Sequence, residues 1–404
     1  MPNHAIRDSI QLLDGRWYQG VPFDDYAWMR ANAPLYWDPI GEIWAVARHE
    51  DIMHVSKTPE LFCSGKSSRP ERDTWIPSMI NFDDPHHKRR RNLVNRGFTP
   101  RRVEDHEENI RTICRELINA VCEKGSCEFV RDIAAPLPMA IIGDMLGVLP
   151  EDRSQLLEWS DDLVTGSGND APGVKERSAK AALGWIQYAQ NVLKDRRANP
   201  ERDDLISMLV HAELDGERLD DEAIIQESLL ILVGGDETTR HVIVQGMEAL
   251  IANPDQRQLL IDDPSRIPLA VEEMLRWVSP IKNMNRTATR DTELRGEKIR
   301  EGDRMLLLYH SGNLDERAFD APEEFRVLRD PNNHVAFGGY GTHFCLGASL
   351  ARLELRIMFE ELLRRLPDIE IAPGAELPLR RNNFIVGIEE MPVTFTPSAP
   401  APSA

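Results

Sequence analysis

The sequence predicts a mainly α-helical protein with a small β region. Apolar residues recur with helical spacing along much of the chain, most clearly over 110–121 and 220–253. Segments with strand composition are few and short: 42–47, 304–309 and 385–395. No internal repeat or long Gly/Ser linker divides the chain, so we expect residues 1–396 to form one domain.

The helical pattern is clearest in two segments. Six apolar residues follow one face of the first: Ile110, Ile113, Cys114, Leu117, Ile118 and Val121. The second begins at the acidic cap Asp220-Asp221 and is stopped by Pro254, which gives a helix of about 50 Å at a rise of 1.5 Å per residue. Because it is apolar on more than one face, we expect it to be central and buried.

Composition limits the kinds of partner and compartment. The 404 residues include 48 basic and 67 acidic side chains, a formal net charge of −19, which argues against nucleic-acid binding. Hydrophobic residues make up 41% of the chain, as in globular proteins, and no apolar run is long enough for a membrane span. The N-terminus lacks an apolar signal core, so we expect a cytoplasmic protein; the Pro/Ser/Ala tail 397–404 is expected to be disordered.

The chain has five cysteines, a number that is odd and low for its length, so we do not expect a disulfide framework. No C-x-x-C pair occurs. Cys114 is expected to be a buried structural thiol. Cys345 lies in an unusual glycine-rich segment, His334–Gly347, with three glycines in four positions. Such a backbone can pass close to something flat or bulky. We expect Cys345 to open a helix and its pKa to be lowered there, which suits a nucleophile or a metal ligand. The alternative is a glycine turn with a buried cysteine.

Three further motifs carry possible chemistry. Glu273 and Arg276 share one helix face at i and i+3, which by itself fits a surface ion pair. In the long helix, Gly234 and Gly235 precede Glu237 and Thr238. The glycines can let a ligand approach, the threonine can bond the carbonyl one turn back, and the acid–alcohol pair can pass protons; simple helix packing is the alternative.

The third motif is His87-x-x-x-Arg91, which lies in a locally basic stretch of an acidic chain. Seven cations occur in fifteen residues without an acid: Lys88, Arg89, Arg90, Arg91, Arg96, Arg101 and Arg102. Arginine donors match carboxylates well because they form a planar fork. One helix face cannot direct every side chain to a ligand, so about half of the run should be a solvated face.

Together these motifs resemble the cytochrome P450 family, the haem-thiolate monooxygenases. The usual ligand loop, F-G-x-G-x-H-x-C-x-G, is matched by Gly339, Gly341, His343, Cys345 and Gly347. Phe337 stands one place further from the cysteine than usual, with Gly338 in its position, as in actinobacterial sterol- and lipid-oxidising branches. The other motifs follow in the family's order, and the resemblance runs from about Trp28 to Phe395.

The resemblance implies a triangular, mainly helical, single haem-binding domain that holds haem b through Cys345 as iron ligand. It assigns His87, Arg91, Arg286 and His343 to the haem propionates. It also assigns Glu237 and Thr238 to oxygen activation, and Glu273 and Arg276 to a buried structural network. The implied reaction inserts one oxygen atom from O2 into a C–H bond.

Longer stretches resemble the actinobacterial enzymes that oxidise the terminal methyl of the cholesterol or cholest-4-en-3-one side chain. They are 132–147, 234–241 and 277–286. A terpene, a fatty acid or another small lipid is the alternative substrate. By matching positions we expect the substrate wall to contain Met79, Ile80, Val233, Gly234, Ile281, Met284, Phe384 and Ile385. Each could instead be ordinary core packing.

Electrons should come from separate proteins, a ferredoxin and its reductase, because the sequence leaves no room for a fused flavin reductase. The basic stretch is the expected docking surface, with Arg101 and Arg102 as its more exposed members. Two other classes compete with this interpretation. A haem sensor would need no proton relay, and a cysteine-nucleophile hydrolase would bind no chromophore.

Overall fold

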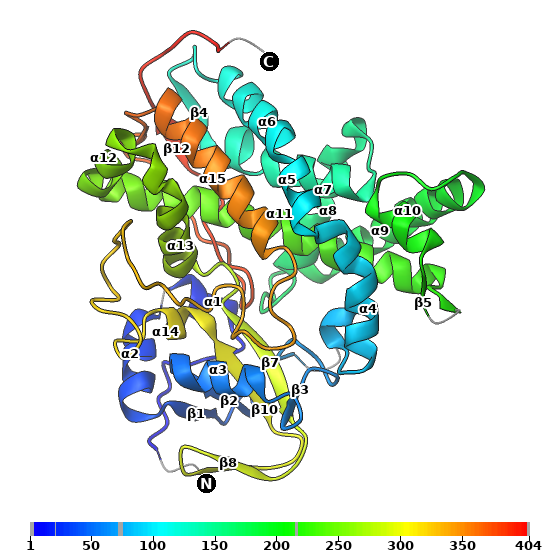
Figure 1. The fold of residues 1–404 in the computed structure, drawn as a ribbon. Helices are drawn as coiled ribbons and strands as arrows, with labels where there is room; N and C mark the ends of the chain where they lie inside the picture. Colours follow the sequence, from blue (N-terminus) through cyan, green and yellow to red (C-terminus); the bar gives the residue numbers. More distant parts are fainter. Residues whose placement is uncertain (1–3, 21, 72–75, 215–216, 402–404) are drawn as a thin grey trace.

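A computed structural model describes residues 4–20, 22–71, 76–214 and 217–401. Figure 1 shows most of the helices gathered in one large part of the molecule and the main sheet below them, with a few short helices beside it. The predicted class, mainly α with a small β region, is confirmed. No helix among the described residues is long and apolar enough to cross a membrane.

The long helix predicted over 220–253 is α11, Asp221–Ala252. The Asp220 carboxylate caps it by accepting a hydrogen bond from the Ala223 N–H, and Pro254 follows as the first residue of the next helix. Figure 1 shows α11 crossing the middle of the helical part. It packs against α7, α8, α13 and α15, so its all-round apolar character is explained by burial on several sides.

Of the other helices, α7, α8, α9, α10, α12, α13 and α15 contact α11. The bounds of all the other helices are α1 Gly15–Gln19, α2 Phe23–Asn32, α3 His49–Lys57, α4 His86–Val94, α5 Pro100–Asp105, α6 Glu107–Asn119, α7 Pro136–Leu146, α8 Arg153–Thr165, α9 Val174–Ala198, α10 Leu205–His211, α12 Pro254–Asp262, α13 Ile267–Val278, α14 Tyr309–Asn313 and α15 Ala348–Arg365. Short 3-10 segments include η1 Met79–Asn81 and η2 Asn95–Phe98. The predicted amphipathic helix is α6, which buries Ile110, Cys114 and Ile118.

The main sheet has five strands in the order β1-β2-β10-β7-β3. They are β1 Leu35–Asp38, β2 Ile43–Val46, β3 Phe62–Cys63, β7 Asn283–Ala288 and β10 Arg304–Leu308. The β2–β10 pair is parallel and the others are antiparallel. Two of the three predicted strands, 42–47 and 304–309, therefore lie in this sheet.

The remaining strands are short: β4 Ser126–Glu128, β5 Glu213–Leu214, β6 Glu217–Arg218, β8 Thr292–Leu294, β9 Glu297–Ile299, β11 Glu370–Ile371 and β12 Pro392–Thr394. The strand predicted over 385–395 is only partly right, because β12 covers three residues of it. Earlier in that range Ile385 and Ile388 form isolated bridges to Ile281 and Leu379.

The described part of the C-terminal tail, 397–401, lies beside α6. Asn119 exchanges hydrogen bonds with the backbone of Ala401, and the Ser398 N–H donates to the Cys122 carbonyl at 2.9 Å. These bonds differ from the disorder expected for 397–404. Residues 402–404 lie outside the described residues.

Candidate active site

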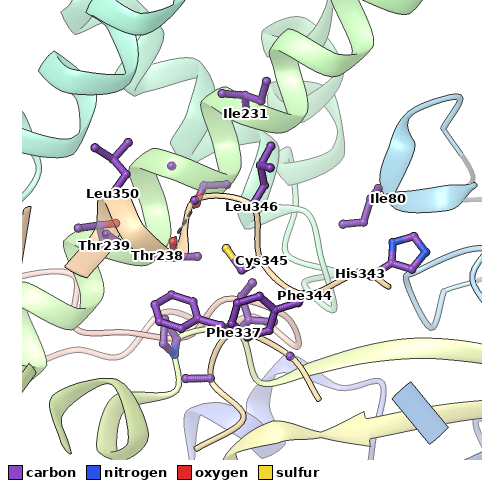
Figure 2. Close-up of a pocket in the computed structure, with 18 of the residues that line it drawn as sticks. Ile80, Ile231, Thr238, Thr239, Phe337, His343, Phe344, Cys345, Leu346 and Leu350 are labelled. Carbon is purple, nitrogen blue, oxygen red and sulfur yellow. Dashed lines mark hydrogen bonds between the residues drawn. The ribbon is translucent and has the colours of Figure 1, made fainter. Parts of the chain in front are cut away.

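A largely apolar cavity lies between α11, the start of α15 and the glycine-rich loop. About 1400 Å³ of empty space lies within this cavity and its solvent-open mouth together. Figure 2 shows Cys345 on this loop with its sulfur directed into the cavity, on the side where Thr238 and Thr239 of α11 lie. The cavity therefore brings together the motif around Thr238 and the motif around Cys345, which are about a hundred residues apart in the sequence.

The sequence predicts that Cys345 is the first residue of a helix. In the structure it lies just before one. The helix α15 begins at Ala348, and the Cys345 N–H donates to the Phe337 carbonyl at 3.0 Å. Burial raises the pKa of the Cys345 thiol, although the Gly347 and Ala348 amides and Arg91 oppose the shift. The expected lowering of this pKa is thus wrong for the protein alone, since removal from water outweighs the nearby dipoles and charge.

The glycines of the loop are needed chiefly for packing against α3. A Cβ at Gly339 would come within 2.3 Å of the Ser56 hydroxyl oxygen, and one at Gly341 within 1.8 Å of the Ser56 carbonyl oxygen. Gly338 has φ of +96°, which side-chain-bearing residues rarely adopt. The bulky neighbour that the glycine pattern predicts is therefore, at these two positions, the end of α3.

The two glycines of α11 have different surroundings. A Cβ at Gly235 would collide with Ile142 of α7, whereas one at Gly234 would meet no atom within 4 Å. Both residues line the cavity. One turn on, the Thr238 hydroxyl donates to the Gly234 carbonyl at 2.8 Å, as predicted. Gly234 and Thr238 thus leave an open stretch of helix surface at the cavity.

Glu237 lies outside the residues that line the cavity. Its Oε2 accepts hydrogen bonds from Arg240 at 2.7 Å and Arg380 at 2.6 Å, and Asp161 accepts from both arginines. Its Oε1 is buried without a hydrogen-bond partner among the described residues. Burial raises the pKa of Glu237 against these arginines, which together hold the pKa of Asp161 down at about 2 despite its own burial.

Four cationic or basic side chains line one end of the cavity: His87, Arg91, Arg286 and His343. His87 and His343 have ring centroids 4.1 Å apart, and the His87 Nε2 is buried without a partner among the described residues. Within the described chain Arg91 and Arg286 form no ion pair; each donates to a backbone carbonyl. Burial and the neighbouring cations lower the pKa of His343 to about 2.

The Glu273–Arg276 pair is fully buried on α13, so it is not a surface ion pair. Arg276 donates to both carboxylate oxygens at 2.7 and 2.8 Å, and also to the carbonyls of Asn313 and Pro322. Arg329 adds a further bond to Glu273 at 3.0 Å. These bonds tie α13 to the chain segment that leads into the glycine-rich loop.

Five of the eight expected wall residues line the cavity: Met79, Ile80, Gly234, Ile281 and Met284. Val233, Phe384 and Ile385 lie outside its lining. Val233 is one position from Gly234, which on a helix turns it about 100° away. Phe384 packs under the Arg69 guanidinium at 3.7 Å, and Ile385 forms a bridge to Ile281.

The wall also contains apolar residues that the sequence analysis missed: Phe98, Ile142, Leu230, Ile231 and Leu346. Leu230 and Ile231 lie one turn before Gly234, so helical periodicity from the glycine could have identified them. Phe98 and Ile142 come from distant segments and leave no comparable signal in the sequence.

Comparison with known proteins identifies the family. The Cytochrome P450 family model matches residues 171–395, which is more than half of the chain. A "Steroid C26-monooxygenase" of Mycolicibacterium smegmatis is 50% identical over 402 residues, covering 99% of each chain. The chain belongs to the cytochrome P450 family. Its enzyme class, cytochrome P450 monooxygenase, is the predicted one.

Two further proteins are similar to this chain over most of its length. A "Methyl-branched lipid omega-hydroxylase" of Mycobacterium bovis is 37% identical, covering 92% of this chain and 90% of its own. The solved structure of a Mycobacterium marinum cytochrome P450 in complex with pseudoionone has a TM-score of 0.89. It is 35% identical and covers 98% of this chain and all of its own.

The haem iron that the P450 family implies fits the cavity. The thiol of Cys345 points into the space, and a thiolate is a soft ligand suited to iron. At the cavity's cationic end, the two arginines without an acidic partner among the described residues and the orphaned His87 nitrogen suit the carboxylates of a porphyrin. Residues from three separate parts of the chain thus fit one cofactor.

Proposed function

We propose that this P450 uses haem b to hydroxylate the terminal methyl group of a sterol side chain, with cholesterol or cholest-4-en-3-one as substrate. The observation that carries the proposal is the 50% identity, over almost the full length of both chains, to a steroid C26-monooxygenase. Substrate preference changes more easily than reaction class within a family, so near-complete coverage matters here.

The chemistry of the cavity supports an apolar substrate. Above Cys345 its walls are aliphatic and aromatic, with Ile80 and Ile231 on different elements facing the same space (Figure 2). Such walls favour a hydrocarbon chain and offer few polar groups to hold it in a fixed direction. Shape and excluded water would therefore position the terminal methyl.

In this proposal Cys345 holds the iron, while His87, Arg91, Arg286 and His343 bind the haem carboxylates. The haem supplies the activation of O2 when bound. Thr238 then presents its hydroxyl at the cavity and holds a water molecule by hydrogen bonding. Glu237, on the same helix but outside the cavity lining, takes up a proton from solvent at its Oε1, which has no partner among the described residues, and passes it to that water through a further water molecule. The apolar wall keeps other water out.

An optical titration of the purified holoprotein tests the substrate. Cholest-4-en-3-one at micromolar concentration should shift the haem spectrum from low spin to high spin. Product analysis should then place the new oxygen on a terminal methyl. If only short terpenes or straight-chain fatty acids bind, the monooxygenase reaction still stands, but the proposal of a sterol substrate is contradicted.

A methyl-branched lipid is the second candidate substrate. The 37% identity to a methyl-branched lipid omega-hydroxylase favours it, and a branched chain end has the same isopropyl shape as a sterol side chain. A branched fatty acid in the same titration separates the candidates. Tighter binding and faster turnover of the branched acid than of cholest-4-en-3-one would favour this second function.

The electron donors in this proposal are a ferredoxin and its reductase. Arg101, at the start of α5, is exposed, whereas Arg102 pairs with Asp203 at 2.8 Å. Both charges remain part of the basic stretch that would attract an acidic donor. Reversing Arg101 and Arg102 to Glu should slow reduction and weaken its salt dependence while haem content stays constant. Unchanged reduction by the donor would place docking elsewhere.

A further inference from the structure

Glu227 is a buried carboxylate that the proposed reaction does not use. It lies in the second turn of α11 and is fully buried. Its Oε1 accepts a hydrogen bond from the Met79 backbone N–H at 2.8 Å and another from Arg90 at 3.3 Å. Its Oε2 has no hydrogen-bond partner among the described residues. An apolar side chain would avoid the cost of this unsatisfied oxygen.

The contacts of Glu227 join three elements around the cavity. Met79 begins η1, and the side chains of Met79 and Ile80 both line the cavity. Ile231, one turn beyond Glu227 on α11, lines it too, and Figure 2 shows Ile80 and Ile231 entering it from separate elements. Glu227 therefore connects the wall formed by η1 to the wall formed by α11.

Arg90 brings the third element, α4, to the same point. Its side chain is 15% exposed, and its guanidinium lies 5.6 Å from the Phe82 ring just after η1. The other cations and histidines of α4 face elsewhere: His87 and Arg91 line the cavity, and His86, Lys88 and Arg89 are exposed. Met79–Asn81 carries no charge. Among the described residues of α4 and η1, Arg90 is thus the charged group that faces Glu227.

Burial raises the pKa of Glu227 to about 7, even though Arg90 and the Met79 amide oppose the shift. The carboxyl therefore changes between charged and neutral forms close to neutral pH. The charged form binds Arg90 and Met79 together, whereas the neutral form loses the attraction to Arg90.

We propose that Glu227 is a positioning residue for the substrate, a latch that holds Met79 and Ile80 against α11 and so sets the width of the cavity. The inference rests on the proposed function only for the identity of the substrate. Closing the latch improves the fit around an apolar chain, and opening it lets the wall move and water enter.

Amide hydrogen exchange of the holoenzyme tests the latch directly. Glu227→Leu should speed exchange at the Met79 amide roughly tenfold or more, because the acceptor is lost. Glu227→Gln keeps an acceptor oxygen and should preserve most of the protection. Glu222→Gln removes the same charge from an exposed position of α11 and should change nothing. Unchanged exchange in Glu227→Leu would overturn the proposal.

Substrate affinity provides the second readout. The dissociation constant of cholest-4-en-3-one should rise about threefold as the pH falls through 7 in the native enzyme, and should not respond to pH in Glu227→Gln. In Glu227→Leu both the dissociation constant and KM should rise roughly tenfold with kcat nearly constant. A pH response that persists in Glu227→Gln, or a parallel loss of kcat and haem, would overturn the positioning role.

Arg90→Met keeps the proposal testable if Glu227→Leu does not fold. Without Arg90 the pKa of Glu227 should rise, so the pH response should move to higher pH; an unmoved response would overturn the latch. If cholest-4-en-3-one binds neither the native enzyme nor any variant, the proposal that it is the substrate is wrong. The exchange at Met79 then still decides whether the latch exists.

Discussion

Two buried Glu–Arg pairs with the same spacing have different surroundings. Glu273 and Arg276 on α13 and Glu237 and Arg240 on α11 are both i, i+3 pairs, each with a shortest contact of 2.7 Å. Both carboxylate oxygens of Glu273 accept hydrogen bonds, and Arg276 makes further bonds to backbone carbonyls. The α11 pair leaves Oε1 of Glu237 and Nε of Arg240 without partners among the described residues.

The difference teaches what each pair can do. A fully satisfied buried pair resists any change of protonation, because each lost bond leaves a charge uncompensated. An incompletely satisfied pair can take or release a proton at lower cost. His241, one turn from Glu237, places its Nε2 3.7 Å from the Glu237 Oε2, and neither of its ring nitrogens has a hydrogen-bond partner among the described residues. We therefore propose that the α13 pair makes the fold rigid and that the α11 pair transfers protons.

The largest expected effect is on the α13 pair. Glu273→Gln leaves Arg276 and Arg329 buried without their carboxylate, so unfolding free energy should fall by about 3–5 kcal/mol and haem content should fall with it. Chemical denaturation and the haem-to-protein ratio measure both. Asp263→Asn, which breaks the exposed i, i+3 pair with Arg266, is the matched control and should have little effect. A stable, haem-replete Glu273→Gln would remove the distinction between the pairs.

Lys282 tests whether incomplete satisfaction of a buried charge is costly in this fold. Its ammonium donates to the Val278 carbonyl, and burial lowers its pKa from 10.5 to about 7. Between pH 7 and 10.5 the unfolded chain binds more protons, so stability rises with pH in this window. Lys282→Met should stabilise the protein by roughly 2 kcal/mol at pH 7, and by less at pH 9.

Thermal or urea unfolding of the Lys282 variant at both pH values checks this. Lys298→Met, at an exposed position of β9, is the control and should give the same stability as the native chain at both. Destabilisation by Lys282→Met at pH 7 would show that the buried ammonium is well accommodated. The link between missing partners and ease of deprotonation would then be lost.

The sequence was sufficient where local rules apply. Periodicity and capping located α11, and the spacing of Thr238 from Gly234 predicted their hydrogen bond. It was insufficient where distant segments meet. The Glu237 network depends on Arg380, 143 positions away, and the cavity wall depends on Phe98 and Ile142, for which no periodic signal exists.

Cys345 shows a different limit of sequence reasoning. Its place before α15 could be predicted to within three residues, but not the direction of its pKa. That direction depends on how much water the surrounding loops exclude, which is a property of the assembled cavity. The sequence also could not show that the two residues of the expected proton relay have different surroundings. Thr238 lines the cavity, whereas Glu237 lies in the ion-pair network.

The next largest effect should come from Thr238, which presents the hydroxyl at the cavity. Thr238→Ala should lower product formed per nicotinamide nucleotide consumed roughly tenfold, or about 1.4 kcal/mol, with hydrogen peroxide appearing instead. Haem content and substrate-induced spectral shifts should stay nearly native. Thr239→Ala changes the next cavity-lining threonine and should affect coupling less. Equal losses in both variants would mean that Thr238 has no special role.

The most direct test of the account is the coupling of Glu237→Gln, measured as hydroxylated product per nicotinamide nucleotide consumed. Glutamine keeps the shape and an acceptor, and Asp161 still pairs with Arg240 and Arg380, so these arginines keep a carboxylate; but glutamine cannot exchange a proton. The account predicts a loss of coupling of about fivefold, near 1 kcal/mol, with native haem content and substrate affinity. Full coupling, or a loss of haem and stability like that expected for Glu273→Gln, would contradict the proton-transfer role of the α11 pair.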